Sequence, residues 1–368
     1  MEKLVAYAGA DFHFPERAGG GAWVGIPEIT GDAIHALTRT VDMCVRDRAP
    51  LLAAGDIFDG PDPEPVALAD VYDQLHRLGN AGLAIYYILG NHDRGRDWLR
   101  PLGPMAINVS GISTRLSTGP TITGLSCIST VDIFILELSK LAKTDIGLYH
   151  QCWQELVSAG SFSLKQIPTH KISICGDIHT NCVLDKPEFS HTIISPGPLS
   201  PQSIAEFEPT KIYAIVSDTA HNLSFREILI PGRNYIRYEL TGPEDADLII
   251  TKLAAQKPTP SLPKNLSKPF VCIRLSGTVP TGFTDTVSAL AQERGFIIKI
   301  STTKPHAQRT VDVRTQSTTD LHEAIHDWAI SSEAKQLASS LVKPGVDLRK
   351  VLQEFKEATI ATPIHRAS

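Results

Sequence analysis

Five short blocks of Asp, His and Asn residues stand out in this chain of 368 residues. Their side chains are carboxylates, amides and imidazoles, which are ligands for divalent ions such as Mn, Fe, Zn and Mg. The blocks lack the cysteine thiolates that are typical of structural zinc sites, so the residue types favour metal-assisted hydrolysis. In chain order they are Asp11-Phe-His13, Gly55-Asp56-Ile-Phe-Asp59, Gly90-Asn91-His92-Asp93, His150 and Gly176-Asp177-Ile-His179.

The spacing within the blocks suits two ions better than one. Hydrolysis of a phosphate ester needs a hydroxide at neutral pH and positive charge at the phosphoryl oxygens, and two divalent ions about 3.5–4 Å apart supply both. Asp11 and His13 are two residues apart, so in an extended segment they lie on one side and can chelate one ion. Asp56 could bridge both ions with its two oxygens. Asn91 offers a neutral oxygen, and His92 is free to meet a substrate. The set is completed by His150, Asp177 and His179.

Nearly every block follows a short apolar run that we predict to be a strand, which places the ligands at strand ends. Helical spacing of apolar residues predicts helices at Asp32–Arg48 and Glu64–Leu78. Strands that alternate with helices over residues 1–230 predict an α/β layered domain with a largely buried sheet. The predicted strands are Leu4–Tyr7, Leu51–Ala54, Ala84–Leu89, Asp145–Tyr149, Lys171–Cys175 and Ile212–Val216.

The pattern changes beyond Pro231, where we predict a small α+β domain over residues 231–315. Residues 316–368 are predicted to be helical, with two amphipathic stretches between Thr318 and Thr359 around a break at Pro344-Gly345. Such a helix–loop–helix needs a surface for its apolar stripes, either on a partner or on its own domain. The elements expected in 231–315 are strands Tyr235–Leu240, Phe270–Leu275 and Phe296–Ile300, and helices Pro243–Ala255 and Phe283–Arg294.

The composition is that of a soluble globular protein, with 42% hydrophobic and 20% charged residues. No stretch is long and apolar enough to span a membrane, and the N-terminus lacks a signal pattern, so we expect a cytoplasmic protein. The six cysteines are scattered without a CxxC pair, which favours reduced thiols. The net charge of −5 gives no general basic field, so binding of nucleic acid would need a local basic patch or another subunit.

The five blocks together resemble the motifs of the calcineurin-like metallophosphoesterase superfamily: Asp-x-His, Gly-Asp-x-x-Asp, Gly-Asn-His-Asp, a lone His and Gly-x-x-His. Within it, Gly-Asp-Ile-Phe-Asp with Gly-Asn-His-Asp is similar to the SbcD-type nucleases of double-strand-break repair, and the likeness covers about residues 1–200. The segment Ser195-Pro-Gly-Pro-Leu199 also resembles the Pro-Gly-Ser segment that follows their last metal motif. The resemblance implies a layered β-sandwich flanked by helices, a small DNA-binding cap domain and a C-terminal helix–loop–helix that docks on an SMC-like ATPase. It also implies a homodimer that acts on DNA.

The resemblance further implies two divalent ions, with Mn expected and Mg as the alternative. The first ion would be held by Asp11, His13, Asp56 and His179. The second would be held by Asp56, Asn91, His150 and the residue at position 177.

Other residues of the blocks are implied to act directly on the substrate or to support the ligands. His92 would protonate the leaving oxygen, and Asp93 would tune its pKa and orientation. Asp59 would not bind an ion itself but would hold the ligands in their orientation. Arg94 and Arg96 follow closely and could contact a DNA backbone, although they could equally form ion pairs with neighbouring acidic residues.

The chain departs from the family pattern at position 177, where the family has Gly-His-x-His and this chain has Gly-Asp-Ile-His. A carboxylate is a suitable ligand for a hard ion. Its added negative charge should weaken the Lewis acidity of the second ion and shift the preference toward Mn or Mg. Asp177 could instead be a structural carboxylate beside the site. This departure and the compact cap suit a viral or otherwise divergent member, and a viral member would act in the host cytoplasm.

Three functions compete on this pattern. The first is a Mn-dependent DNA exonuclease or endonuclease subunit in DNA repair or recombination. The second is a small-molecule phosphodiesterase or a phosphatase of the same superfamily. Phosphatases of this kind usually carry an Arg directly after Gly-Asp-x-x-Asp, and Gly60 stands there in this chain, which favours diesters. The third is a weakly catalytic scaffold that bridges DNA, which the unusual Asp177 keeps open.

Overall fold

The computed structural model describes residues 2–14, 31–93, 96–158, 160–185, 189, 191–202, 206, 208–256, 262–263 and 266–302. These residues belong to one compact unit, Met1–Thr302. The predicted C-terminal helices between Thr318 and Thr359 lie outside the described residues, as does the predicted boundary at 315/316. Docking of those helices on a partner therefore stays a prediction.

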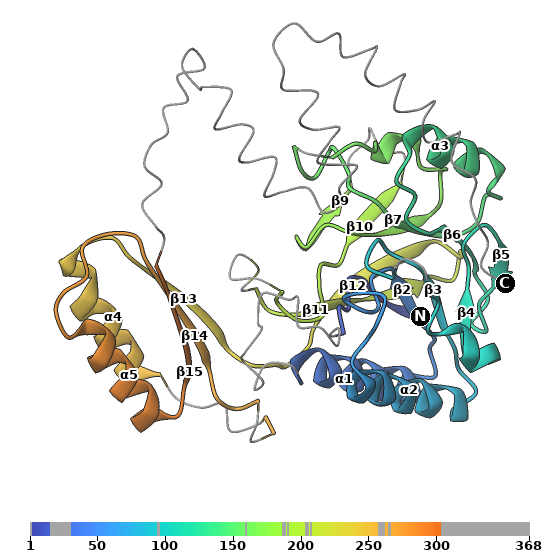
Figure 1. The fold of residues 1–368 in the computed structure, drawn as a ribbon. Coiled ribbons are helices and arrows are strands. Elements are labelled where there is room, and N and C mark those ends of the chain that lie inside the picture. Colours follow the sequence, from blue (N-terminus) through green and yellow to red (C-terminus); the bar gives the residue numbers. More distant parts are fainter. Residues whose placement is uncertain are drawn as a thin grey trace, which may run out of the picture. The chain divides into compact units, whose positions relative to one another are not determined.

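A first sheet of six strands has the order β12-β11-β1-β2-β3-β4. Four of its strands are parallel, namely β1 (Lys3–Gly9), β2 (Leu51–Ala54), β3 (Ile85–Ile88) and β4 (Ala106–Asn108). The antiparallel strands β11 (Lys211–Ser217) and β12 (Leu223–Leu229) extend the sheet beyond β1. Parallel neighbours need long crossovers, and helices α1 (Asp32–Asp47) and α2 (Pro65–Asn80) provide them. The two helices lie side by side on one face of this sheet (Figure 1).

A second sheet of six strands has the order β5-β6-β7-β8-β10-β9. Its parallel centre consists of β6 (Thr121–Leu125), β7 (Ile146–His150), β8 (Ile172–Gly176) and β10 (Thr192–Ser195). The edge strands β5 (Ser113–Arg115) and β9 (Cys182–Leu184) are antiparallel to their neighbours. Helix α3 (Val131–Lys140) packs on the outer face through its buried Phe134 and Leu138. Two short 3₁₀ helices complete the connections, at Arg100–Met105 and Leu164–Gln166.

Alternate residues of the central strands face two different cores. On β2, Leu51 and Ala53 face the core under α1 and α2, whereas Leu52 and Ala54 face a core shared with the second sheet. Side chains of a strand point alternately to its two faces, so such a strand is apolar at every position. The result is four layers, in the order α1 and α2, first sheet, second sheet and α3. The predicted mixed α/β architecture is confirmed.

The small unit beyond Pro231 contains every helix and strand predicted for it, but its class differs from the prediction. Strands β13 (Tyr235–Leu240), β14 (Phe270–Leu275) and β15 (Ile297–Thr302) form a parallel sheet, connected through α4 (Pro243–Ala255) and α5 (Phe283–Arg294). The predicted α+β class was wrong, because strands and helices alternate here and each helix connects two parallel strands. Both helices pack on the sheet around a core that includes Val271, Ile273 and Val287.

No helix among the described residues combines the length and the hydropathy that a membrane span needs.

A buried histidine in the second sheet makes the stability of the fold depend on pH. Tyr149 donates its hydroxyl proton to Nε2 of His170 at 2.6 Å, and Nδ1 of His170 donates to the carbonyl of Thr144 at 3.1 Å. The neutral imidazole of His170 thus makes a hydrogen bond with each of its two ring nitrogens. Burial of His170 lowers its pKa to about 4 from the usual 6.5.

We expect His170 to destabilise the folded protein progressively as the pH falls from 6.5 to 4. In this range the unfolded chain binds a proton at His170 and the folded chain does not, so the free energy of unfolding decreases with falling pH. The shift corresponds to about 3 kcal/mol at most. Urea unfolding of wild type and His170→Gln at pH 7 and pH 5 checks this, with exposed His76→Gln as the control. Equal pH dependence in all three proteins would contradict the prediction.

Candidate metal centre

The predicted ligands come together where the carboxyl ends of both sheets meet. Asp11 follows β1, Asp56 follows β2 and Asn91 follows β3, and these parallel strands end at the same edge of the first sheet. In the second sheet His150 is the last residue of β7, and Asp177 follows β8. Strand β2 contacts both β7 and β8, so the two edges lie against each other. One site therefore draws its side chains from five strands.

Glycines before the ligands allow this close contact. A Cβ atom on Gly90 would lie 2.0 Å from Oδ1 of Asp56. A Cβ atom on Gly176 would lie 2.2 Å from the carbonyl oxygen of Ala54 and 2.6 Å from Nδ1 of His150. Neither space admits a side chain. The glycine that precedes the ligand in these blocks is thus a packing requirement of the site.

The backbone at the site is strained. Six non-glycine residues of the described part have positive φ, and four of them are Asp11 (51°), His13 (47°), Asp56 (49°) and Asp177 (80°). Non-glycine residues in unusual φ/ψ regions cost about 1–3 kcal/mol each, and they concentrate at functional sites. The positive φ angles thus identify four of the residues that the sequence motifs also identify, and the two observations are independent.

Three histidines direct equivalent ring nitrogens into the site. Nδ1 of His150 donates to a main-chain carbonyl of β2 at 2.8 Å. Nδ1 of His13 lies 3.3 Å from Oδ1 of Asp59, and Nδ1 of His179 lies 3.2 Å from Oε1 of Glu206. A partner at Nδ1 fixes the tautomer and the ring orientation, and leaves Nε2 as the ligand atom.

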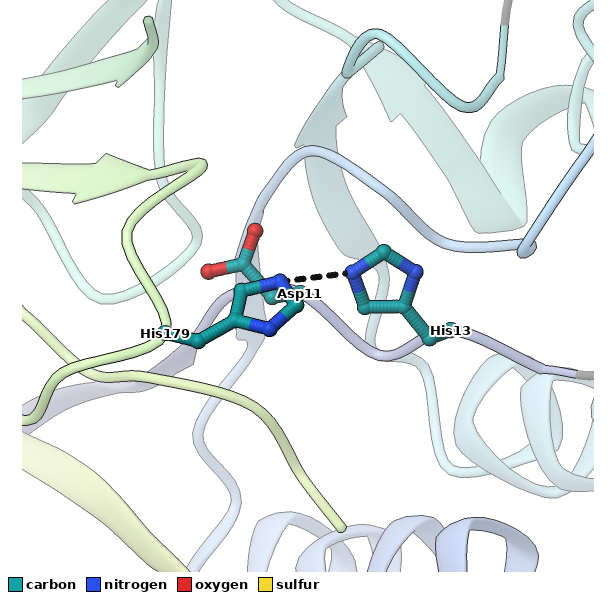
Figure 2. A group of neighbouring side chains, drawn as sticks. All are labelled: Asp11, His13 and His179. Carbon is teal, nitrogen blue, oxygen red and sulfur yellow. Dashed lines mark hydrogen bonds between the residues drawn. The ribbon is translucent and has the colours of Figure 1, made fainter. Parts of the chain in front are cut away.

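Oδ2 of Asp56 lies close to two of these ring nitrogens, 3.6 Å from Nε2 of His13 and 3.3 Å from Nε2 of His150. Its Oδ1 accepts the backbone N–H of His92 at 2.8 Å, which fixes the carboxylate. Nε2 of His13 is 3.0 Å from Nε2 of His179, and Figure 2 shows these two rings beside Asp11. Asp56 thus lies close to two groups of donor atoms.

The carboxylate of Asp11 tests whether these residues fit a cation. Its side chain is fully buried, and burial raises its pKa. Oδ1 accepts the backbone N–H of Asp177 at 2.9 Å, whereas Oδ2 is buried and has no hydrogen-bond partner among the described residues. A buried carboxylate oxygen without a partner is costly, and a bound cation would compensate it. The oxygen and imidazole donors around it suit a divalent ion.

Three overlapping sets of residues could hold a metal ion, each with donor atoms within 4.8 Å of one another. They are Asp11, His13 and His179; Asp11, Asp56 and His150; and His13, Asp56 and His92.

Two of the predicted ligands join the centre on the His150 side. Asn91 Oδ1 lies 2.8 Å from Nε2 of His150. Asp177 Oδ1 lies 3.6 Å from the same nitrogen, and its side chain is 20% exposed. Asp177 belongs to none of the three sets, so it occupies the rim of the centre.

The carboxylates of the centre favour the protonated form of His150. Burial opposes ionisation of Asp56, but its hydrogen bond to His150 and the charges of His150 and His13 outweigh it and lower the pKa to about 2. Burial opposes protonation of His150, yet hydrogen bonds to Asp177 and Asp56 raise its pKa well above the usual range. A metal ion binds the neutral imidazole, so metal binding must release this proton.

Asp59 contacts both a candidate ligand and the candidate acid. Its Oδ1 is 3.3 Å from Nδ1 of His13 and 3.2 Å from Nδ1 of His92. The hydrogen bond to Asp59 raises the pKa of His92 to about 9, against the effect of burial. The side chain of His92 is 40% exposed, and its ring packs edge-on against His13 at 4.8 Å. His92 is therefore a partly exposed imidazole whose protonated form is favoured.

Asp93 occupies a different place from the one we predicted. Its carboxylate accepts three backbone N–H groups, from Ile57, Phe58 and Gly90, at 3.0–3.1 Å. These bonds tie the loop after β2 to the loop after β3. The contact with the His92 imidazole, which we assigned to Asp93, is made by Asp59 instead.

Two further residues of the site have no sequence motif. Glu206 contacts His179, and its other oxygen accepts the backbone N–H of Gln202 at 2.8 Å. The thiol of Cys152 lies beside Asp177, and burial, together with that charge, raises its pKa. Only the spacing of Cys152, two residues after His150, could have suggested it. Nothing in the sequence marks Glu206.

We expect Glu206→Ala to weaken Mn binding about 10- to 100-fold, because His179 would lose the carboxylate that orients it. Glu206→Gln should restore most of the affinity, since an amide oxygen can also accept from Nδ1. Calorimetric titration with Mn measures the effect. Glu137→Ala on the exposed surface of α3 is the matched control. Wild-type affinity in Glu206→Ala would show that the contact does not support the ligand.

Of the two arginines predicted to contact DNA, the structure describes only Arg96. Arg94 lies outside the described residues. The Arg96 side chain is 60% exposed, lies 3.3 Å from Oδ1 of Asp62 and packs over the ring of Trp98 at 5.4 Å. Ion pairing thus exists at this position, and DNA contact by Arg96 stays a prediction.

The described residues form a buried centre of carboxylate, imidazole and amide groups at the junction of two sheets. No protein-family model matches this chain, and no curated protein matches it. The centre is therefore assigned from its own geometry, as a set of Asp and His residues that could hold a metal ion.

Proposed function

We propose that this protein is a Mn-dependent phosphodiesterase that cleaves DNA, with the layered architecture of the metallophosphoesterases. The position of Asp56 carries the proposal. Its Oδ2 lies close to Nε2 of His13 and to Nε2 of His150. A carboxylate within reach of two groups of donor atoms would suit a pair of divalent ions, which would supply positive charge for hydrolysis of a phosphodiester.

The residues divide into two sets around the shared carboxylate. Asp11, His13, Asp56 and His179 would hold one ion, and Asp56, Asn91, His150 and Asp177 the other. When bound, the ions supply positive charge at the phosphoryl oxygens and lower the pKa of water. The carboxylate-rich donor set favours Mn, with Mg as the alternative.

His92 would complete the reaction from the protein side. As an incoming water oxygen bonds to phosphorus and the bond to the leaving oxygen breaks, the imidazolium of His92 would give its proton to that oxygen. The water would lose a proton to the solvent, and His92 would regain one from it. Asp59 would hold the ring through Nδ1 and leave Nε2 to act. The half-exposed position of His92 supports this role.

Three features favour a nucleic-acid diester as the substrate. Gly60 stands where phosphatases of the resembling superfamily carry an Arg for a terminal phosphate. The motifs resemble those of SbcD-type nucleases. The small unit with β13, β14 and β15 matches the place of their cap domain in the chain. On the same resemblance we propose that the protein is a homodimer and works with an SMC-like ATPase.

One substrate panel tests the proposal. The purified full chain is incubated with Mn, or with Mn and excess EDTA, on linear duplex DNA, bis-p-nitrophenyl phosphate and p-nitrophenyl phosphate. We expect Mn-dependent cleavage of DNA and of the diester, with little turnover of the monoester. Monoester turnover without DNA cleavage would instead indicate a phosphatase. DNA binding without cleavage of any substrate would indicate a scaffold.

Asp177 should set the metal preference of the centre. We expect Asp177→His to increase the affinity for Zn relative to Mn, because an imidazole replaces a charged oxygen donor beside His150. Competitive titration with both metals measures the ratio of affinities. An unchanged ratio, together with unchanged diesterase activity, would show that Asp177 is not a ligand.

A further inference from the structure

A small pocket adjoins the candidate metal centre. Its volume is about 270 Å³, and His179 forms part of its wall. His179 also belongs to one of the three sets that could hold a metal ion, so the pocket and the candidate metal centre share this residue. Pockets for drug-sized ligands measure about 300–1,000 Å³, so this one suits a single small group.

One end of the pocket is polar and held in place. Asn181 donates from its amide nitrogen to the carbonyl of Pro196 at 2.7 Å, and its oxygen accepts the hydroxyl of Tyr213 at 2.9 Å. Nζ of Lys211 lies 3.3 Å from the same oxygen and 3.1 Å from Oε2 of Glu227. An ammonium has three donors, and the hydrogen bonds among the described residues use two of those of Lys211.

Four prolines also line the pocket, namely Pro196, Pro198, Pro201 and Pro209. Proline fixes its own φ angle, so this part of the lining is rigid. Its ring faces are apolar and can cover the flat face of a base or the carbon face of a sugar. The combination of proline side chains and hydrogen-bonded polar groups in the lining suits a ring system with hydrogen-bonding edges.

Charge argues against a second phosphate in this pocket. The lining includes the carboxylates of Glu206 and Glu208. Lys211 is the lysine of the lining, and Glu227 already neutralises it. A phosphate would meet more negative than positive charge, whereas an uncharged group with donors and acceptors would not.

We propose that this pocket binds the nucleoside on one side of the scissile phosphate. The inference rests on the proposed diesterase function and adds to it a site that selects nucleotide esters over simple ones. Lys211 and Asn181 contact the edge of the base or sugar, and the prolines cover its face.

Two substrates with the same leaving group test the inference. They are the p-nitrophenyl ester of thymidine 5′-monophosphate and bis-p-nitrophenyl phosphate, each assayed with the Mn-loaded full chain. We expect kcat/KM for the nucleotide ester to exceed that for the simple diester by about tenfold or more. Lys211→Met, which keeps the aliphatic stem, should reduce this ratio about tenfold. Lys171→Met, outside the pocket but similarly ion-paired, should keep the wild-type ratio.

A second variant separates loss of the pocket from a folding defect in Lys211→Met. Thr180 is exposed and lines the pocket, so Thr180→Tyr should fill it and reduce the same ratio. A wild-type ratio near one, or a ratio that neither variant changes, overturns the inference while the diesterase function stands. Absence of Mn-dependent turnover of both esters overturns the proposed function, and the inference with it.

Discussion

Asp56→Asn should abolish metal-dependent hydrolysis, with a loss of about 10³-fold or more in kcat/KM on bis-p-nitrophenyl phosphate. The carboxylate is buried, and its Oδ2 lies within 3.6 Å of Nε2 of both His13 and His150. An amide keeps the shape but loses the negative charge, so both donor groups are weakened together. Metal ions contribute several kcal/mol to hydrolysis, and each 1.36 kcal/mol is a factor of ten in rate.

A binding measurement separates this loss from a folding defect. A ligand that binds only the folded state raises its melting temperature, so Mn should stabilise the wild type against heat and should stabilise Asp56→Asn much less. Asp42→Asn, an ion-paired aspartate of α1 outside the site, should behave as the wild type. Full stabilisation by Mn in Asp56→Asn would remove Asp56 from the ligand set.

His92→Asn should slow DNA cleavage by about 10²- to 10⁴-fold and leave Mn binding largely intact. The sugar oxygen that leaves in DNA cleavage needs a proton, and His92 is the exposed donor that Asp59 holds beside the candidate metal centre. p-Nitrophenolate leaves without a proton. The same variant should therefore slow the hydrolysis of bis-p-nitrophenyl phosphate far less than that of DNA.

The contrast between leaving groups identifies the role of His92. Single-turnover rates on DNA and on the nitrophenyl diester are compared for wild type, His92→Asn and His76→Asn. The last is an exposed histidine of α2 and serves as the control. An equal loss on both substrates would instead assign His92 to metal binding, a role that its place beside His13 and Asp56 also permits.

Several mostly apolar strands were predictable from the sequence, whereas the three-residue strands and helix α3 were not. The six predicted strands correspond to β1, β2, β3, β7, β8 and β11, because these strands are mostly apolar and buried on both faces. Strands β4, β5 and β9 have three residues each, too few to show a period of two. Helix α3 escaped prediction because Ile133, Ile135 and Leu136 are exposed apolar residues that hide its helical periodicity.

The sequence by itself determined which residues can form the centre. Carboxylate, amide and imidazole side chains at strand ends come from neighbouring parallel strands and so meet at one edge. Asp11, Asp56 and His150 show this, because each lies at or just after the strand that was predicted for it. The position of each residue relative to its own strand is therefore enough to identify it as a possible ligand.

Only the tertiary structure decided which groups support the ligands. Asp59 rather than Asp93 contacts His92, Glu206 contacts His179, and Asp177 lies at the rim beside His150 and Cys152. These contacts join residues that are up to 33 positions apart, as Asp59 and His92 are. Partners of a ligand depend on how loops from different strands pack, and no spacing within one segment encodes that packing. The identity of the possible ligands thus follows from the local sequence, whereas the contacts that hold those ligands in place depend on the tertiary fold.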